Sequence, residues 1–299
     1  MSAQLTLVER KPGYSKGLRV LLYGFLTVLA LAWLVPVGGA LYASLRPYGE
    51  TQTKGIFSWP DSLGFSNYRD AFNQGNMAKT FFNTAFIVLP SIVLILLMSS
   101  VMAFVVSRFS FRFNVALLLL FTAGNLLPAQ VLFQPLFQFF KAVPWPDALS
   151  DTDTGSLLGT KIAVIIVHVA FQTGFCTFVL SNYMKTIPKE LNEAALVDGA
   201  SVPRTFFQII LPLCRPALAA LATLEFTWLY NDFFWAVVLL NKGDERPITS
   251  SIANLGGAFF TNDNLVAAAS MIVAMPTLVV YLILQRQFIS GLTLGASKG

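Results

Sequence analysis

Long apolar runs separated by short polar stretches make up most of the chain. Six runs reach the roughly 20 residues that a helix needs to cross a hydrocarbon core of about 30 Å. They lie at about 18–45, 80–107, 114–139, 162–183, 210–240 and 264–287. The pattern predicts an all-α membrane protein with six transmembrane helices in one domain, 18–287. It leaves an N-terminal segment at 1–17 and a C-terminal tail at 288–299.

Composition supports a membrane protein and the charges suggest its orientation. Of the 299 residues, 55% are hydrophobic and 12% are charged, against about 25% charged in soluble domains. Lys and Arg near span ends stay on the cytoplasmic side, and an inside N-terminus places twelve of the 20 there. Both termini are therefore expected in the cytoplasm and the spans in the plasma or inner membrane. The first apolar run is longer than the core of a signal peptide, so we expect it to be retained.

The net charge of +5 does not by itself indicate a nucleic-acid partner. The basic residues are scattered over short loops instead of forming a stripe, and a stripe is what nucleic-acid binding requires. The two cysteines, Cys176 and Cys214, both fall within predicted spans. They are expected to be packing residues and not a disulfide framework.

The third apolar run carries an unusual polar face. Gln130, Gln134 and Gln138 recur every four residues, and Pro128 and Pro135 lie in the same run. Amides in lipid need hydrogen-bond partners, and proline frees a backbone carbonyl. This face is therefore expected to meet either other helices or a water-filled path, and the pattern alone does not choose between them.

The polar stretch at 186–212 predicts a helix, a sharp turn and a second helix. Pro188 suits the first helical turn and Gly199 suits the left-handed residue that ends a helix. Ser201 and Pro203 then begin a second short helix. A helix lying on the membrane surface would explain Pro188 and Gly199, but not the longer spacing pattern from Glu193 to Pro212 that is described next. A DNA-reading helix-turn-helix is disfavoured because membrane spans flank the loop.

The same stretch contains a longer spacing pattern. Glu193-Ala194-Ala195 is followed after three residues by Gly199, and nine residues later by Ile209-Ile210-Leu211-Pro212. This pattern resembles the cytoplasmic coupling loop in the membrane subunits of ABC importers. Asn231-Asp232-Phe233 and the tail from Gly291 are similar to the carbohydrate-importing group. The tail looks like that of the shorter permease subunit of maltose-type importers.

The resemblance implies a type I ABC importer permease fold with a cytoplasmic coupling helix. The residues matching that helix would contact the ATPase: Glu193, Ala194, Ala195, Asp198, Gly199 and Ala200. The tail residues Gly291, Gly295 and Lys298 would also reach it, although a frayed terminus is the simpler reading of an unmatched tail. From helical spacing alone, Leu191, Ala194, Ala195 and Asp198 form one docking stripe.

The resemblance also implies partner subunits, of which the ATP-binding subunits would hold the catalytic chemistry. They are a second homologous permease subunit, two ATP-binding subunits and an extracytoplasmic sugar-binding protein. The chain has no G-x-x-x-x-G-K-[ST] phosphate loop, so ATP and Mg would bind to the partner ATPase and the chain would hold no cofactor and not be an enzyme. No metal-ligand spacing occurs.

Polar groups within the spans are candidates for the substrate pathway, because they are costly in lipid. Glu225 and Asp232 lie seven residues apart and would share one face of a fifth helix over 210–240. His168 is expected to be a neutral, hydrogen-bonded ring, with a proton relay as the alternative. The full candidate set is Gln130, Gln134, Gln172, Glu225, Tyr230, Asn231 and Asp232.

The sequence favours one half of the pore of an ATP-driven sugar importer that works by alternating access. The main alternative is an ion-coupled secondary transporter that uses Glu225, Asp232 and His168. Such carriers are commonly built from repeats, and no repeat is visible here. A membrane-embedded enzyme is the third reading, and it lacks a nucleophile or metal pattern.

Overall fold

The computed structural model describes residues 15–124, 127–146, 155–255 and 262–293. In this part of the chain the regular structure is helical, apart from an isolated bridge between Pro144 and Ser156. The first half contains α1 Lys16–Ser44, α2 Tyr48–Lys54, α3 Ser66–Gln74, α4 Met77–Arg108, α5 Asn114–Ala123, α6 Ala129–Ala142 and α7 Lys161–Thr186. The second half contains α8 Glu190–Val197, α9 Val202–Thr205, η3 Phe206–Ile210, α10 Leu211–Leu213, α11 Arg215–Tyr230, α12 Phe234–Leu239, η4 Gly243–Glu245, α13 Ile248–Ser251, η5 Ile252–Leu255 and α14 Asp263–Thr293.

Four helices in the described residues are long and apolar enough to cross a membrane. They are α1, α4, α7 and α14, the last over Asp263–Gln285. A fifth candidate is the pair Val202–Leu213 and Arg215–Tyr230, which bends by 72° at its break. The all-helical membrane class is thus confirmed, with four to five candidate spans where the apolar pattern predicts six.

The prediction of one helix over 114–139 is wrong. The segment forms two short helices, α5 with 10 residues and α6 with 14. Pro128 is extended, with ψ 132°, at the start of α6, and its ring cannot supply the amide donor that a continuous helix needs there. Asn125, a further polar residue of this run, lies outside the described residues.

The prediction of one helix over 210–240 is also wrong. Helix α11 ends at Tyr230, and α12 starts again at Phe234. The Asp232 carboxylate accepts hydrogen bonds from the backbone N–H groups of Trp235 and Ala236 at 3.4 and 3.2 Å. An acceptor that caps a new helix favours the break, so Glu225 and Asp232 do not share a helix face.

Helices α4 and α7 form the centre of the bundle, and two buried clusters connect them to α11 and α12. At Gly174 of α7, an added Cβ would lie 2.0 Å from the carbonyl oxygen of Phe121 in α5. Only glycine permits this approach, in the way that small residues allow close helix packing in membranes. Gly174 therefore sets how closely α5 lies on α7.

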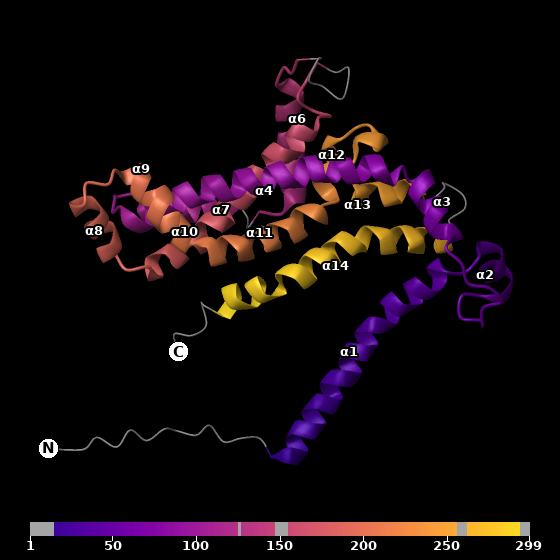
Figure 1. Cartoon of the computed structure of the whole chain (residues 1–299). Coiled ribbons are helices and arrows are strands. Elements are labelled where there is room, and N and C mark those ends of the chain that lie inside the picture. The colour runs from indigo at the N-terminus through magenta and orange to yellow at the C-terminus, as the bar shows by residue number, and fades with distance from the viewer. Residues whose placement is uncertain (1–14, 125–126, 147–154, 256–261, 294–299) are drawn as a thin grey trace.

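The elements are divided between two ends of the bundle (Figure 1). Helices α8 and α9 lie at one end, and α2 and α3 lie at the other. The C-terminal part of α14 points toward the α8 end, whereas α1 splays away from the bundle. Nearly all of the membrane-length part of α1 is exposed. We call the α8 end the inner end and the α2–α3 end the outer end.

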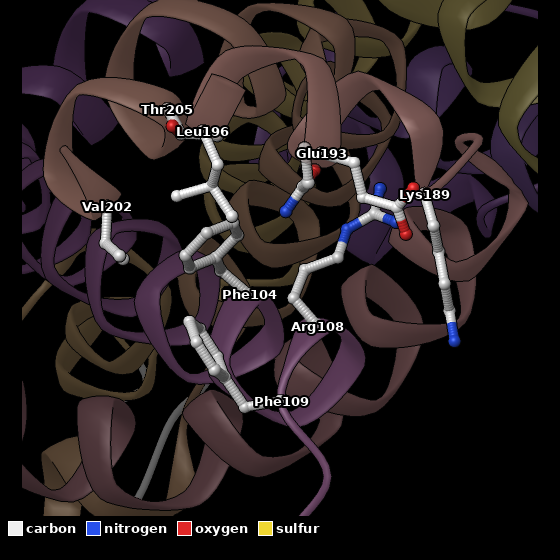
Figure 2. Close-up of a pocket in the computed structure, with 9 residues that line it drawn as sticks. Phe104, Arg108, Phe109, Lys189, Glu193, Leu196, Val202 and Thr205 are labelled. Carbon is white, nitrogen blue, oxygen red and sulfur yellow. The ribbon is translucent and has the colours of Figure 1, made fainter. Parts of the chain in front are cut away.

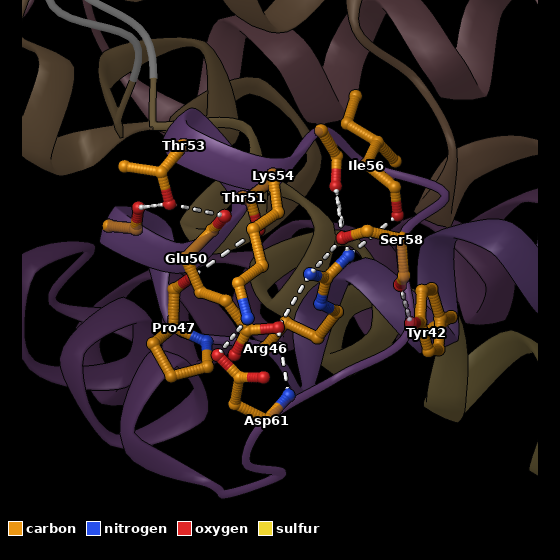
Figure 3. Close-up of polar contacts among 12 residues, drawn as sticks. Tyr42, Arg46, Pro47, Glu50, Thr51, Thr53, Lys54, Ile56, Ser58 and Asp61 are labelled. Atoms are coloured by element: carbon orange, nitrogen blue, oxygen red, sulfur yellow. Dashed lines mark hydrogen bonds and ion pairs between the residues drawn. The ribbon is translucent and has the colours of Figure 1, made fainter.

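The outer end is organised around Arg46, whose side chain is fully buried (Figure 3). Its Nη2 atom donates to Glu50 Oε1 at 2.6 Å and to Ser58 Oγ at 2.8 Å. Its Nη1 atom donates to the carbonyl oxygens of Gly55 and Ile56 at 3.1 and 2.8 Å. The arginine thus folds the loop back on itself, since a buried cation requires such partners.

Two buried asparagines connect this loop to the bundle. Asn67 of α3 donates to the carbonyl oxygens of Ser44 and Arg46. Asn264 of α14 donates to those of Ala43 and Arg46. The last carbonyl groups of a helix lack partners within the helix, so both amides stabilise the end of α1. Helix α3, which begins at Ser66, and helix α2 are the two short helices of this outer loop.

Candidate coupling site and polar groups of the bundle

The segment at the inner end is the predicted helix, turn and helix. Glu190 and Glu193 lie in the first turn of α8, where carboxylates interact favourably with the helix dipole. Gly199 has φ +75°. The Gly199 N–H donates to the carbonyl of Leu196 and the Ala200 N–H to that of Ala195, at 3.1 and 2.9 Å. This pair of bonds is the Schellman closure, which needs a left-handed residue at the glycine position.

The exposed face of α8 differs from the stripe predicted by helical spacing. Ala195 is only 5% exposed and packs toward its own chain. Leu191, Leu196 and Val197 are exposed, and Val197 is 87% exposed. The stripe that includes Ala195 is therefore wrong, and the helix presents apolar side chains together with Glu193, Ala194 and Asp198. Spacing alone could not identify which side of so short a helix the chain itself would cover.

A cavity of about 190 Å³ lies between this loop and the end of α4. Figure 2 shows Phe104, Arg108 and Phe109 of the α4 region facing Glu193, Leu196 and Val202 of the loop. At the margins of the cavity the loop touches α4 directly. The rings of Phe104 and Phe206 have centroids 5.0 Å apart, and Arg108 Nη1 donates to the carbonyl of Ile187 at 3.1 Å. A displacement of the loop would therefore be transmitted to α4 through these contacts.

The polar pathway candidates fall into two groups. Gln130, Gln134 and Asn231 are exposed on the single chain. Gln172 is half-buried, and its Oε1 atom has no hydrogen-bond partner among the described residues. The glutamine face of α6 is thus not covered by the described helices of this chain, which leaves both earlier readings of that face available.

The second group is buried within the chain. Glu225 is fully buried, and its Oε1 atom accepts a hydrogen bond from the Cys176 thiol at 3.1 Å. The Tyr230 hydroxyl donates to the carbonyl of Val273 at 2.8 Å and joins α11 to α14. These two side chains face the packing between helices, and Cys176 is a packing residue as expected.

His168 and Asp232 form a pair that the sequence pattern did not predict. His168 Nε2 lies 3.7 Å from Asp232 Oδ2. The carboxylate also caps α12, and the Thr249 hydroxyl donates to the Asp232 carbonyl at 3.0 Å. No hydrogen bond to Nε2 of His168 is made by the described residues. Asp232 therefore fixes the junction of α11, α12 and α13.

The tail candidates are only partly described. Gly291 lies in the last turns of α14, which runs beyond the predicted span end at residue 287 to Thr293. Gly295 and Lys298 lie outside the described residues. Within the described ranges, no group of three or more His, Cys, Asp or Glu side chains could hold a metal ion.

Comparisons with known proteins identify the class of this arrangement. Residues 95–293 match the family model described as "Binding-protein-dependent transport system inner membrane component". A probable ABC transporter permease of Pyrococcus horikoshii is 30% identical over 266 residues, covering 88% of this chain and 92% of the relative. The melibiose/raffinose/stachyose import permease MelC of Bacillus subtilis is 30% identical over 273 residues, covering 91% and 94%.

A solved structure shows the same fold. The crystal structure of a bacterial ABC transporter involved in the import of the acidic polysaccharide alginate superimposes with a TM-score of 0.76 at 20% identity. The match covers 93% of this chain and 100% of the other. The family decides against the ion-coupled carrier and the membrane-embedded enzyme. The chain belongs to the family of binding-protein-dependent inner-membrane components and is a multi-pass ABC transporter permease subunit, not itself an ATPase.

Proposed function

We propose that this chain is the sugar-importing kind of permease and forms one half of a pore that works by alternating access. Its relatives include importers named for melibiose, raffinose and stachyose and for diacetylchitobiose. The solved transporter with the same fold imports a polysaccharide. Exposed amides at Gln130, Gln134 and Asn231 supply the donors and acceptors that sugar hydroxyl groups require.

The proposed topology is the type I importer fold with six spans. The broken pair α5 and α6 supplies one span, and α9 to α11 supplies another. The inner end is cytoplasmic, together with residues 1–17 and the tail at 288–299, which agrees with the excess of Lys and Arg assigned to that side. The domain is 18–287 and the coupling loop is 186–212.

The coupling loop is the proposed contact with the ATPase. The contact comprises Glu193, Ala194, Asp198 and the exposed Val197, while Ala195, Gly199 and Ala200 hold the shape of the loop. The supporting observation is the closed turn at Gly199 that holds α8 outward with Val197 87% exposed. Because the loop also contacts α4 through Arg108 and Phe104, movement of the ATPase would pass to the spans.

The remaining partners follow from surfaces that this chain leaves open. The exposed surface of α1 and the glutamine face of α6 are proposed to contact the second permease subunit and to line the substrate pathway. The outer end is proposed to receive the sugar-loaded binding protein. ATP and Mg would be bound by the two ATPase subunits, and the tail around Gly291, Gly295 and Lys298 would reach them.

The buried candidates are proposed to act by position. Glu225 and Tyr230 hold α11 against α7 and α14. Asp232 holds the break between α11 and α12. Gln172, whose side-chain carbonyl oxygen has no hydrogen-bond partner among the described residues, is proposed to face the pathway. Substitution of the exposed amides Gln130, Gln134 and Asn231 should alter the affinity for sugar. Substitution of the buried side chains should instead alter the amount of folded protein.

Uptake by the reconstituted complex tests this function. Proteoliposomes with the second permease, the ATPase and the binding protein should accumulate radiolabelled oligosaccharide only when ATP is enclosed with the ATPase. A Gly199→Val variant should lose most uptake, because φ +75° is strained for a β-branched residue. Gly49→Val, where the added side chain meets open space at the outer end, is the matched control. Uptake that persists without the ATPase would overturn the proposal.

A further inference from the structure

A second cavity at the inner end has the character of an anion site. It measures about 350 Å³ and lies where the end of α4, the start of α5 and the end of α7 meet. Its polar lining consists of Ser107, Arg108, Ser110, Asn114, Lys185 and Lys189. Three of these side chains are cationic and the lining includes no carboxylate. The lining described for this cavity is therefore cationic, and the carboxylate of Glu193 lines the neighbouring cavity together with Arg108 and Lys189.

Arg108 is the strongest feature of this cavity. Its Nη1 atom donates to Ile187, whereas Nε and Nη2 are buried and have no hydrogen-bond partner among the described residues. Although the Arg108 residue as a whole is half-buried, guanidinium donors that are buried without a partner are unfavourable unless an acceptor reaches them. Planar paired donors match the oxygens of a phosphate or carboxylate.

Asn114 adds an acceptor to the same wall. Its Nδ2 atom donates to the carbonyl oxygens of Val106 and Phe109 at 2.8 and 3.0 Å. These bonds fix the amide, and its Oδ1 atom is left buried without a partner in the described chain. A ligand that satisfies both residues carries an anionic oxygen for Arg108 and a hydroxyl or amine donor for Asn114.

The surface next to the cavity is apolar. Helix α5 begins at Asn114, and its next turns expose Val115, Leu119 and Leu120. A ligand with an anionic head in the cavity could therefore lay a hydrocarbon tail along α5. An acidic side chain of the ATPase would make no use of this second surface.

We propose that the cavity binds a phosphate group, and that its source is the headgroup of an anionic phospholipid in the cytoplasmic leaflet. The inference goes beyond the sugar-import function and needs only the inner end to face the cytoplasm. Arg108 and Lys189 also line the cavity beneath α8. A bound headgroup would thus connect the membrane surface to the coupling loop and make ATP-driven transport depend on anionic lipid.

Lipid retention by the intact complex tests the site. The complex is purified, delipidated and exposed to dioleoyl phosphatidylglycerol or dioleoyl phosphatidylcholine, and bound lipid is counted by native mass spectrometry. The wild type should retain phosphatidylglycerol in preference. Lys185→Gln should lower its apparent affinity about fivefold, which is the expected effect of one basic residue at an anionic surface. Arg108→Gln should lower it at least as much.

The matched control is Arg112→Gln. Arg112 is an exposed arginine in the same turn and does not line the cavity, so its loss should leave retention within twofold. Because Arg108 also supports Ile187, a poorly folded Arg108→Gln complex would not decide the question, and the exposed Lys185 would then carry the test. Equal retention by the wild type and Lys185→Gln, or no preference between the two lipids, would overturn the proposal.

A competition arm separates the two phosphate sources. Inorganic phosphate at 10 mM should leave phosphatidylglycerol bound, because the ion cannot use the apolar face of α5. Displacement of the lipid by phosphate alone would overturn the lipid source and assign the cavity to a soluble anion. If the complex shows no lipid preference and Lys185 cross-links to an acidic residue of the ATPase in the lipid-free complex, neither the lipid nor the soluble anion is the occupant of the cavity.

Discussion

The two ends of the bundle treat their exposed and buried groups in opposite ways. At the outer end the buried Arg46 is held by Glu50, Ser58 and two carbonyl groups of its own loop. At the inner end Val197 is exposed and Arg108 keeps unused donors. Among the described residues, Arg46 thus makes four hydrogen bonds and leaves only Nε without a partner, whereas Arg108 makes one and leaves Nε and Nη2 without partners. The difference separates a scaffold built around a well-paired arginine from a coupling surface whose arginine is mostly unpaired within the described chain.

The largest expected effect is on the scaffold. Arg46→Ala removes a fully buried side chain and its four hydrogen bonds within the outer loop, so the midpoint of thermal unfolding should fall further than in any other variant named below. Thermal unfolding of the purified complex measures this. Arg69→Ala, on the exposed face of α3, should change the midpoint by less than about 2 °C. Similar midpoints for the two variants would show that the outer end does not depend on Arg46.

The next effect concerns the close approach of α5 and α7. Gly174→Ala places a Cβ 2.0 Å from the Phe121 carbonyl oxygen, and such overpacking costs about 1–3 kcal/mol. The midpoint of thermal unfolding should fall accordingly. Gly49→Ala on α2, where no described atom lies within 4 Å of the added Cβ, is the control and should unfold like the wild type. An unchanged Gly174→Ala midpoint would show that α5 is free to move away from α7.

A smaller effect is expected on binding of the ATPase, and only for substitutions at the inner end. Val197→Asp should weaken binding of the ATPase about tenfold, because an exposed apolar contact would be replaced by a charge that must be desolvated. Stability of the permease should not change, as is usual for exposed positions. Leu63→Asp places the same charge at an exposed apolar position of the outer end. Equal loss of ATPase binding in both variants would remove the distinction between the two ends.

The smallest effect is a pH dependence of the outer loop. The hydrogen bond from Arg46 holds the pKa of Glu50 below its ordinary value. A carboxyl with a lowered folded-state pKa stabilises the fold above its unfolded pKa of about 4.3, and this contribution is lost as pH falls through the folded value. The unfolding midpoint of the wild type should therefore decline on acidification more steeply than that of Glu50→Gln. Parallel curves would contradict the coupling.

The parts of the fold that the sequence predicted are those specified by local signals. Gly199 requires a left-handed turn, and Glu193-Ala194-Ala195 has a recognisable spacing, so the shape of the coupling loop followed from a few residues. Apolar length identified α1, α4, α7 and α14 in the same way. These features depend on neighbours in the chain and need no tertiary information.

The parts that the sequence did not predict depend on distant contacts. A run of apolar residues cannot show that Asp232 caps a new helix near His168, or that Pro128 ends the continuity of a span. Nor can helical spacing show that Ala195 faces its own chain. The same holds for the pathway candidate Glu225, because its carboxylate accepts a hydrogen bond from Cys176 of α7, which is far from it in the sequence.

Photo-crosslinking at the two ends tests the central claim most directly. A photoreactive amino acid is placed at Val197 in one complex and at Phe57, which is also highly exposed at the outer end, in another. The account predicts that illumination attaches the ATPase to the Val197 probe, that the yield changes when ATP is bound, and that the Phe57 probe yields no ATPase product. ATPase attached at Phe57, or none attached at Val197, would contradict the assignment of α8 as the coupling helix.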